Sequence, residues 1–200
     1  MISPDRNRRL RVHRLGAAFL IAVLSLAGTG CSSTVDRSEN ASAADESTSS
    51  KSATLGVEEA REKAKAVSSQ IYDMIGIKEG KVTEPGPGIA PCEEDPERLY
   101  STVHPWSVYG VSEDELRGGF QRLKDNLPEQ GWKIVEYGPN NSKSKTLEIT
   151  ADSKTEPFSL NAELWVSSPA TGTEKDPKIL FNLTSGCFRA PEGTNLDQEF

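Results

Sequence analysis

The chain alternates apolar and polar residues most regularly in Phe158-Ser159-Leu160-Asn161-Ala162-Glu163-Leu164-Trp165-Val166. Successive side chains of a β-strand point to opposite faces of a sheet, so this period of two predicts a strand with one buried and one exposed face. Strands covered on both faces would form continuous apolar runs instead. The stretch therefore decides the fold class, because it predicts a mainly antiparallel sheet of which only one face is covered.

Four other stretches carry strand signals. Residues 147–151 and 179–184 alternate in the same way, residues 132–137 alternate less regularly, and residues 100–109 form a longer segment. We predict five strands in all. The longest segment contains Pro105, which has no backbone N–H to donate, and this predicts a sheet edge or a bulge.

Two segments have the period of an amphipathic helix. In residues 57–76, apolar side chains recur at spacings of three and four, with charged residues between them. The second helix is predicted to begin at a capping box formed by Ser112 and Glu115. Its middle contains Gly118 and Gly119, which lower helix stability and therefore predict close packing against another element.

These elements predict an α+β fold with two layers. Five strands about 4.8 Å apart are roughly 24 Å wide, and two helices of about 10 Å diameter cover nearly that width on one side. We therefore expect a single domain at residues 57–190, with two helices on one face of a five-stranded, mainly antiparallel sheet and a bare opposite face. Residues 191–200 are mostly polar and predict a flexible tail.

The first 30 residues have the composition of an export signal. Five arginines precede an apolar run at residues 15–27, and small residues follow it. This run of 13 residues is too short to cross a bilayer, which needs about 20. We therefore expect residues 1–30 to be a signal peptide that is removed after export.

The junction Leu26-Ala27-Gly28-Thr29-Gly30-Cys31 resembles the lipobox of bacterial lipoproteins, in particular those of actinobacteria, although Gly28 stands where leucine is most usual. The resemblance implies that Cys31 receives a diacylglycerol and anchors the protein to the extracytoplasmic face of the cell membrane. The alternative is cleavage by an ordinary signal peptidase, which leaves Cys31 as a free or paired thiol. Residues 31–56 contain few large apolar side chains and predict a disordered tether.

Removal of the signal changes the charge of the protein. The first 30 residues hold five arginines and one aspartate, so the remaining chain has 18 basic and 29 acidic side chains and a net charge of −11. Nucleic acids and anionic lipids repel such a chain. Nucleic-acid binding is therefore disfavoured, and membrane attachment is expected to depend on the lipid anchor.

The two remaining cysteines, Cys92 and Cys187, are predicted to form a disulfide after export. A metal site is the alternative, but only His104 remains as a histidine ligand once the signal is removed. Residues 93–95 form an acidic run that can collect a divalent cation, although adjacent carboxylates in a loop are more often a solvated turn. We expect no metal and no cofactor.

The sequence contains no recognised catalytic motif. Acyl-transfer enzymes need a nucleophile beside a base, and His104, in a His-Pro dipeptide, is interpreted as a surface or edge histidine. The glycine-containing run at residues 86–88 carries a proline and lacks the lysine that follows a phosphate-binding loop. We therefore expect a protein that is not an enzyme.

A binding surface is the remaining hypothesis. Trp165 lies on the polar face of its strand, and Leu180 and Phe188 share the parity opposite Cys187, so these three side chains are predicted to form an apolar patch on the bare face. We expect the domain to bind an envelope protein or a small ligand. The alternatives are a hydrolase that acts on cell-wall material and a lipid carrier.

Overall fold

The computed structural model describes residues 52–83, 86–170 and 172–199. Every described residue belongs to one compact unit, Thr48–Phe200. The predicted signal peptide, Cys31 and most of the predicted tether lie outside the described residues. Within the described ranges, no helix is both long enough and apolar enough to cross a membrane.

Both predicted helices are present. The helix α1 (Val57–Ile75) buries its apolar stripe and ends at Gly76, whose left-handed backbone (φ 62°) is favourable for glycine. The helix α2 (Glu113–Asn126) begins after Ser112, whose hydroxyl oxygen accepts a hydrogen bond from the backbone N–H of Glu115. The boundaries that the sequence predicts for the start of α2 and the end of α1 are therefore confirmed.

The described residues form one antiparallel sheet of eight strands. Its five long strands lie in the order β3 (Leu99–Tyr109), β7 (Lys178–Ser185), β6 (Phe158–Trp165), β5 (Leu147–Ser153) and β4 (Trp132–Pro139). Three short strands pair with β3, namely β1 (Lys81–Val82), β2 (Gly88–Pro91) and β8 (Phe188–Arg189). The α+β class is confirmed, but five strands were too few, because strands of two to four residues are too short to show a period of two.

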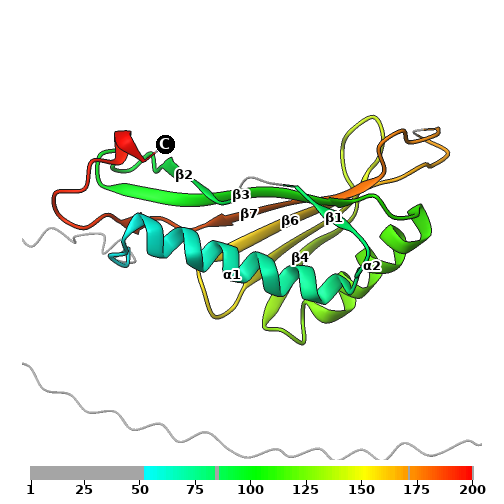
Figure 1. Ribbon diagram of the computed structural model, residues 1–200, viewed down its shortest axis with the longest axis horizontal. Coiled ribbons are helices and arrows are strands. Elements are labelled where there is room, and N and C mark those ends of the chain that lie inside the picture. Colours follow the sequence, from blue (N-terminus) through cyan, green and yellow to red (C-terminus); the bar gives the residue numbers. More distant parts are fainter. Residues whose placement is uncertain (1–51, 84–85, 171, 200) are drawn as a thin grey trace, which may run out of the picture. The chain divides into compact units, whose positions relative to one another are not determined.

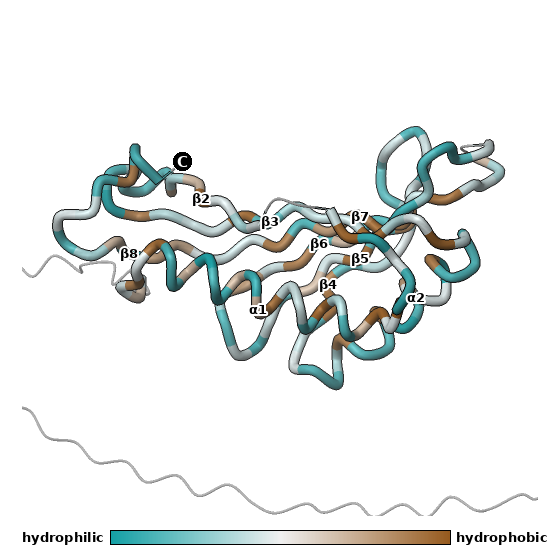
Figure 2. The backbone as a smooth tube through the Cα atoms, viewed as in Figure 1, coloured by the Kyte–Doolittle hydropathy of each residue, from teal (hydrophilic) through white to brown (hydrophobic). Residues whose placement is uncertain are grey.

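Both helices lie on the same side of the sheet (Figure 1), and hydrophobic and hydrophilic segments alternate along the helices and strands (Figure 2). The main core joins the apolar stripes of α1 and α2 to the sheet. In one row across the sheet, the strand register aligns Trp106, Phe181 and Ala162. The predicted close packing is found at Gly119, where an added Cβ would lie 2.6 Å from the Cδ1 atom of Ile77.

One extra residue between β7 and β8 reverses the side-chain parity of the chain. Val103 of β3 pairs with Thr184 of β7, and Tyr100 of β3 pairs with Phe188 of β8. Three residues along β3 therefore correspond to four residues along the segment from β7 to β8. This irregularity turns Phe188 towards the helices, where only 3% of its surface is exposed. The expectation that Phe188 shares the bare face with Leu180 is therefore wrong.

A second, smaller core lies beneath the N-terminal half of β3 and includes both ends of the folded unit. Its buried members are Val57, Ala60, Tyr100, Phe188 and Leu196. Thr54 forms a parallel bridge with Arg189, and Leu196 belongs to a short 3-10 helix, η1 (Leu196–Gln198). Contrary to the expected boundaries at 57 and 190, the folded unit therefore includes residues before α1 and most of the segment predicted to be a flexible tail.

Candidate ligand-binding cleft

A cleft of about 690 Å³ lies between α1 and the adjoining edge of the sheet. One wall comes from α1, the other from β1, β3 and the residues that follow β1. The residues that line it are Glu58, Arg61, Glu62, Lys65, Ser68, Ser69, Tyr72, Asp73, Val82, Thr83, Gly86, Pro87, His104 and Trp106. Two short strands pair with the outer edge of β3: β1 pairs with Val108 and Tyr109, and β2 pairs with residues 100–103.

Pro105 lies between the two parts of β3 that pair with β1 and β2. Ser107 exchanges hydrogen bonds with Thr83 at the outer edge, since its backbone N–H donates to Thr83 Oγ1 and its carbonyl accepts from the Thr83 N–H. Backbone groups two residues apart on a strand point to the same side, so the nitrogen of Pro105 faces the same edge. The predicted edge position of this proline is therefore confirmed, and no ladder hydrogen bond is lost.

Ser68 and His104 form a buried polar pair in the wall of the cleft. Ser68 lies on the apolar stripe of α1, and His104 lies on the helix-facing side of β3, two residues before Trp106. The Oγ atom of Ser68 is 2.7 Å from Nδ1 of His104, and the two residues are only 5% and 8% exposed. The interpretation of His104 as a surface histidine is therefore wrong, because the even parity of β3 turns it towards α1.

Aromatic side chains extend the cleft wall beside this pair. Trp106 stacks on Phe181 with ring centroids 4.0 Å apart, and Tyr72 approaches its edge at 6.4 Å. The Tyr72 hydroxyl donates to the carbonyl of Ile77, which fixes the phenol ring. Among the described residues, the indole Nε1 of Trp106 has no hydrogen-bond acceptor although it is buried. The wall thus combines a rigid apolar surface with a donor that nothing in the described part of the chain satisfies.

Among the described residues, the charged side chains that line the cleft lie on α1. Arg61 is already held by Glu58 and by Glu199 of the C-terminal segment. Within the described ranges, Lys65 forms no ion pair. Glu62 and Asp73 are 11 residues apart, about 16 Å along a helix, so they cannot flank one glycosidic bond from opposite sides.

Two of the three residues predicted to form an apolar patch lie together on the bare face, and the third does not. Trp165 is 38% exposed, but its Nε1 donates to a carboxylate oxygen of Glu163 at 2.7 Å and the ammonium of Lys178 lies 5.2 Å from its ring centroid. Leu180 is half-buried, and its register neighbour on β6 is Glu163. With Phe188 in the second core, the predicted patch is reduced to Trp165 and Leu180, which are diagonal neighbours on β6 and β7 beside Glu163 and Lys178.

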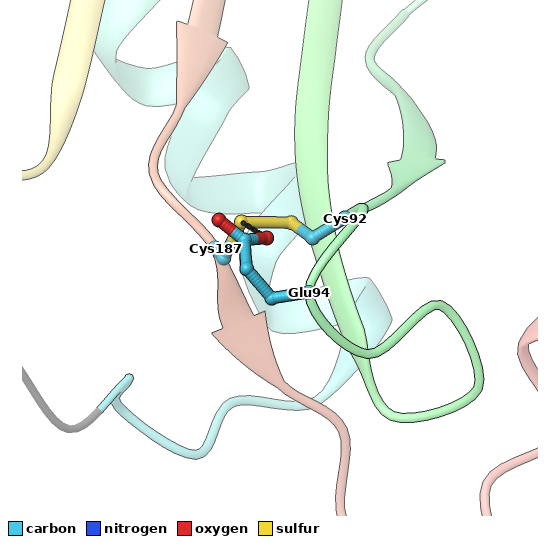
Figure 3. A group of neighbouring side chains, drawn as sticks. All are labelled: Cys92, Glu94 and Cys187. Atoms are coloured by element: carbon cyan, nitrogen blue, oxygen red, sulfur yellow. Dashed lines mark hydrogen bonds between the residues drawn. A yellow bond between two sulfur atoms is a disulfide. The ribbon is translucent and has the colours of Figure 1, made fainter. Parts of the chain in front are cut away.

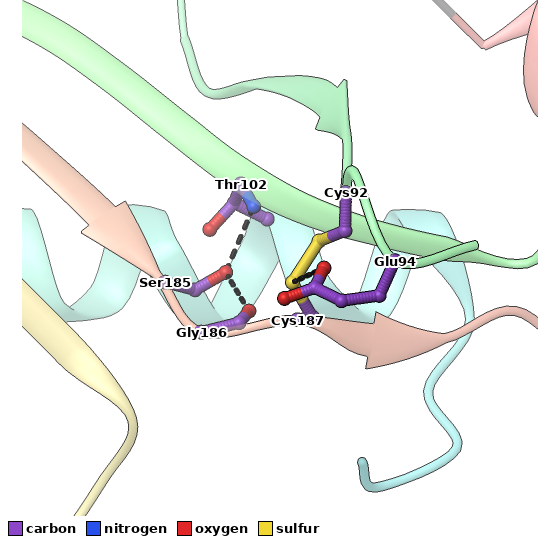
Figure 4. The surroundings of a disulfide bond; sticks show 6 residues. All are labelled: Cys92, Glu94, Thr102, Ser185, Gly186 and Cys187. Atoms are coloured by element: carbon purple, nitrogen blue, oxygen red, sulfur yellow. Dashed lines mark hydrogen bonds between the residues drawn. A yellow bond between two sulfur atoms is a disulfide. The ribbon is translucent and has the colours of Figure 1, made fainter. Parts of the chain in front are cut away.

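The structure joins Cys92 and Cys187 in a disulfide with a Cα–Cα distance of 6.3 Å, which agrees with the predicted pairing. Figure 4 shows its surroundings, where Ser185 Oγ accepts from the Thr102 N–H and donates to the carbonyl of Gly186, each at 2.8 Å. Cys92 follows β2 and Cys187 precedes β8, and these strands pair with opposite edges of β3. The disulfide therefore ties together both neighbours of the N-terminal half of β3.

Glu94 lies against the disulfide (Figure 3), with Oε2 3.9 Å from Cys187 Sγ. In the described part of the chain, Cys92, Glu94 and Cys187 are the one group of three potential metal ligands within reach of one another. The sulfurs are bonded to each other and offer no thiolate, so a cation would find a single carboxylate here.

Sequence reasoning missed Ser68, Tyr72 and Trp106 as cleft residues. A signal for Ser68 was present, because it is a polar residue on the helix face that also carries Val67 and Ile71. Comparison of the chain with protein-family models, with curated proteins and with solved structures found no match. The geometry of the cleft is therefore the basis for a proposed function.

Proposed function

We propose that this protein is a lipoprotein of the cell envelope whose α+β domain binds a small ligand in the cleft between α1 and β3. The cleft carries the proposal, since its volume of about 690 Å³ lies in the range of small-molecule sites, about 300 to 1,000 Å³. Such sites combine apolar walls with a few convergent polar groups. Trp106 and Tyr72 supply the apolar wall, and Ser68 and His104 supply the polar groups.

A small ligand is better supported than a protein partner. A protein interface requires a broad surface, and interface cores are depleted of charged side chains. Of the predicted patch, the bare face keeps only Trp165 and Leu180, and the charged side chains of Glu163 and Lys178 lie beside them. The cleft instead has a charged rim and an aromatic wall, which together suit an amphipathic molecule of limited size.

The location of the protein is part of the proposal. The lipobox-like junction supports attachment through Cys31, and the net charge of −11 beyond residue 30 requires an anchor other than a basic surface. The polar segment between Cys31 and the folded unit serves as a flexible tether. We expect the domain to stand at the extracytoplasmic face of the membrane, where its cleft is open to envelope molecules.

Native mass spectrometry of the full-length lipidated protein, released from detergent micelles, tests the proposal. We expect a non-covalent adduct, and dissociation of the complex gives the ligand mass. A matched pair of variants locates the site: Val82→Trp fills the cleft from β1, whereas Val135→Trp adds the same bulk on β4, away from it. The two valines are similarly exposed, at 45% and 48%.

The adduct should survive in Val135→Trp and disappear in Val82→Trp. Circular dichroism of both variants confirms that the fold is retained. An adduct that persists in Val82→Trp would place the ligand elsewhere and refute the assignment of the cleft. No adduct on the wild-type protein would count against a bound small molecule altogether. A ligand with the mass of a membrane lipid would favour the carrier alternative.

A further inference from the structure

We propose that Ser68 is a nucleophile that removes the acyl group from small carboxylic esters bound in the cleft, with His104 as its base. This inference rests on the proposed function, because the ester must enter the same cleft. No sequence motif places a nucleophile beside a base. The folded chain brings together residues 36 positions apart to form such a pair.

The pair has the arrangement with which nucleophilic catalysis begins, a hydroxyl group within hydrogen-bond distance of a base. A serine hydroxyl becomes reactive when a base within about 2.6 to 3.2 Å accepts its proton. The Ser68 Oγ and His104 Nδ1 atoms are 2.7 Å apart. Both side chains line the cleft and are more than nine-tenths buried, which limits competition from water for their hydrogen bond.

Trp106 lies in the same wall, with its ring centroid 6.4 Å from that of His104. Its indole Nε1 has no acceptor among the described residues and exposes less than 1 Å², so a ligand oxygen reaches it only after the wall opens. Acyl-transfer sites depend on such donors to stabilise the tetrahedral intermediate, and the proposed reaction therefore includes this opening.

The proposed reaction has two steps. In the first, the hydroxyl proton of Ser68 moves to Nδ1 of His104 while Oγ bonds to the ester carbonyl carbon. The bond from that carbon to the ester oxygen then breaks, and the departing alcohol takes the proton from His104. In the second step, water attacks the acyl-serine, His104 accepts its proton and returns it to Oγ, and the carboxylic acid leaves.

Fluorophosphonate-biotin tests this proposal, because it phosphonylates activated serines and releases fluoride. The reagent is applied to membranes that contain the full-length protein, and the labelled residue is located by peptide mass spectrometry. We expect the label on Ser68. Hydrolysis of p-nitrophenyl acetate and p-nitrophenyl butyrate provides a second readout, which Ser68→Ala should lower by about a hundredfold.

Ser159→Ala is the matched control. Ser159 lies on β6, outside the residues that line the cleft, and its hydroxyl donates to a carboxylate oxygen of Asp152 at 2.7 Å. Its loss should leave both labelling and ester hydrolysis unchanged. Mapping the label on the wild-type protein keeps the test decisive even if Ser68→Ala folds poorly.

Two outcomes separate this inference from the proposed function. A native ligand adduct that is sensitive to Val82→Trp, together with an unlabelled Ser68, would overturn the nucleophile and leave the binding function standing. If both the adduct and the label are absent, both proposals fail. Hydrolysis that is equal in wild type and Ser68→Ala would likewise overturn the role of Ser68.

Discussion

Removal of the disulfide should destabilise the folded unit by about 4 to 5 kcal/mol. The bond joins Cys92 and Cys187, which are 95 residues apart in sequence. In the chain-entropy account, closing a loop of about 100 residues in the unfolded chain contributes about 4.7 kcal/mol to the free energy of unfolding. Domains of this size have total stabilities of about 5 to 15 kcal/mol, so a large part of the stability depends on this bond.

The loss should begin at one end of the sheet. The disulfide ties β2 to the segment before β8, and both strands pair with the N-terminal half of β3. The second core, which contains Tyr100 and Leu196, lies beside it. In the Cys92→Ser/Cys187→Ser variant, amide hydrogen exchange should therefore accelerate first in β2, β8 and η1, before β5 and β6 lose protection.

Equilibrium unfolding in urea, followed by tryptophan fluorescence, measures the global effect. With a slope of about 2 kcal/mol per molar urea, the midpoint should fall by about 2 M. Wild-type protein treated with a reductant is the control and should show the same loss without any substitution. A change below about 1 kcal/mol would refute the reasoning, because it would show that the unfolded chain gains little freedom when the bond is absent.

Four further predictions concern other parts of the chain. Ser112→Ala removes a helix cap and should lower the free energy of unfolding by about 1 kcal/mol in urea titrations, whereas no change would deny the cap a role. Burial raises the pKa of Tyr100 to about 12. Its contribution to the free energy of unfolding is therefore complete below about pH 10 and is lost as the pH rises through 12. Tyr100→Phe should flatten this decline of stability at alkaline pH. Intact-mass analysis should find a diacylglycerol adduct at Cys31, and an unmodified thiol would exclude the anchor. In a double-mutant cycle with Ser68→Ala and His104→Leu, thermal unfolding should show coupling of about 0.5 to 3 kcal/mol, and additive effects would contradict the pair.

The parts of the fold that sequence predicts well are those in which one signal repeats. In α1, an apolar side chain recurs on nearly every turn, and the left-handed Gly76 marks the end of the helix. In β6, eight residues alternate without interruption between buried and more exposed positions. Such repetition makes a prediction robust, because tertiary packing would have to overcome several positions at once. The cysteine pair was predictable for another reason, since export and cysteine count restrict the alternatives.

The errors arise where one residue decides the outcome. The assignment of Phe188 to the bare face assumed unbroken alternation from Ile179 onwards, and the extra residue near Gly186 reverses it. A bulge leaves little mark in sequence beyond a glycine. For His104, the neighbouring Pro105 favours a strand edge, whereas its parity matches that of the buried Trp106 and places it towards α1.

The Ser68 and His104 pair is not explained by stability alone. A buried polar side chain loses its contact with water, and a good hydrogen bond offsets this cost with little surplus. Replacement of both partners by apolar side chains of similar shape is often neutral or stabilising. Ser68 lies on a stripe that otherwise buries valine, isoleucine and alanine, so an apolar side chain would suit the core equally well. Because both side chains also line the cleft, the proposed contact with a ligand gives a reason for their polarity that packing does not.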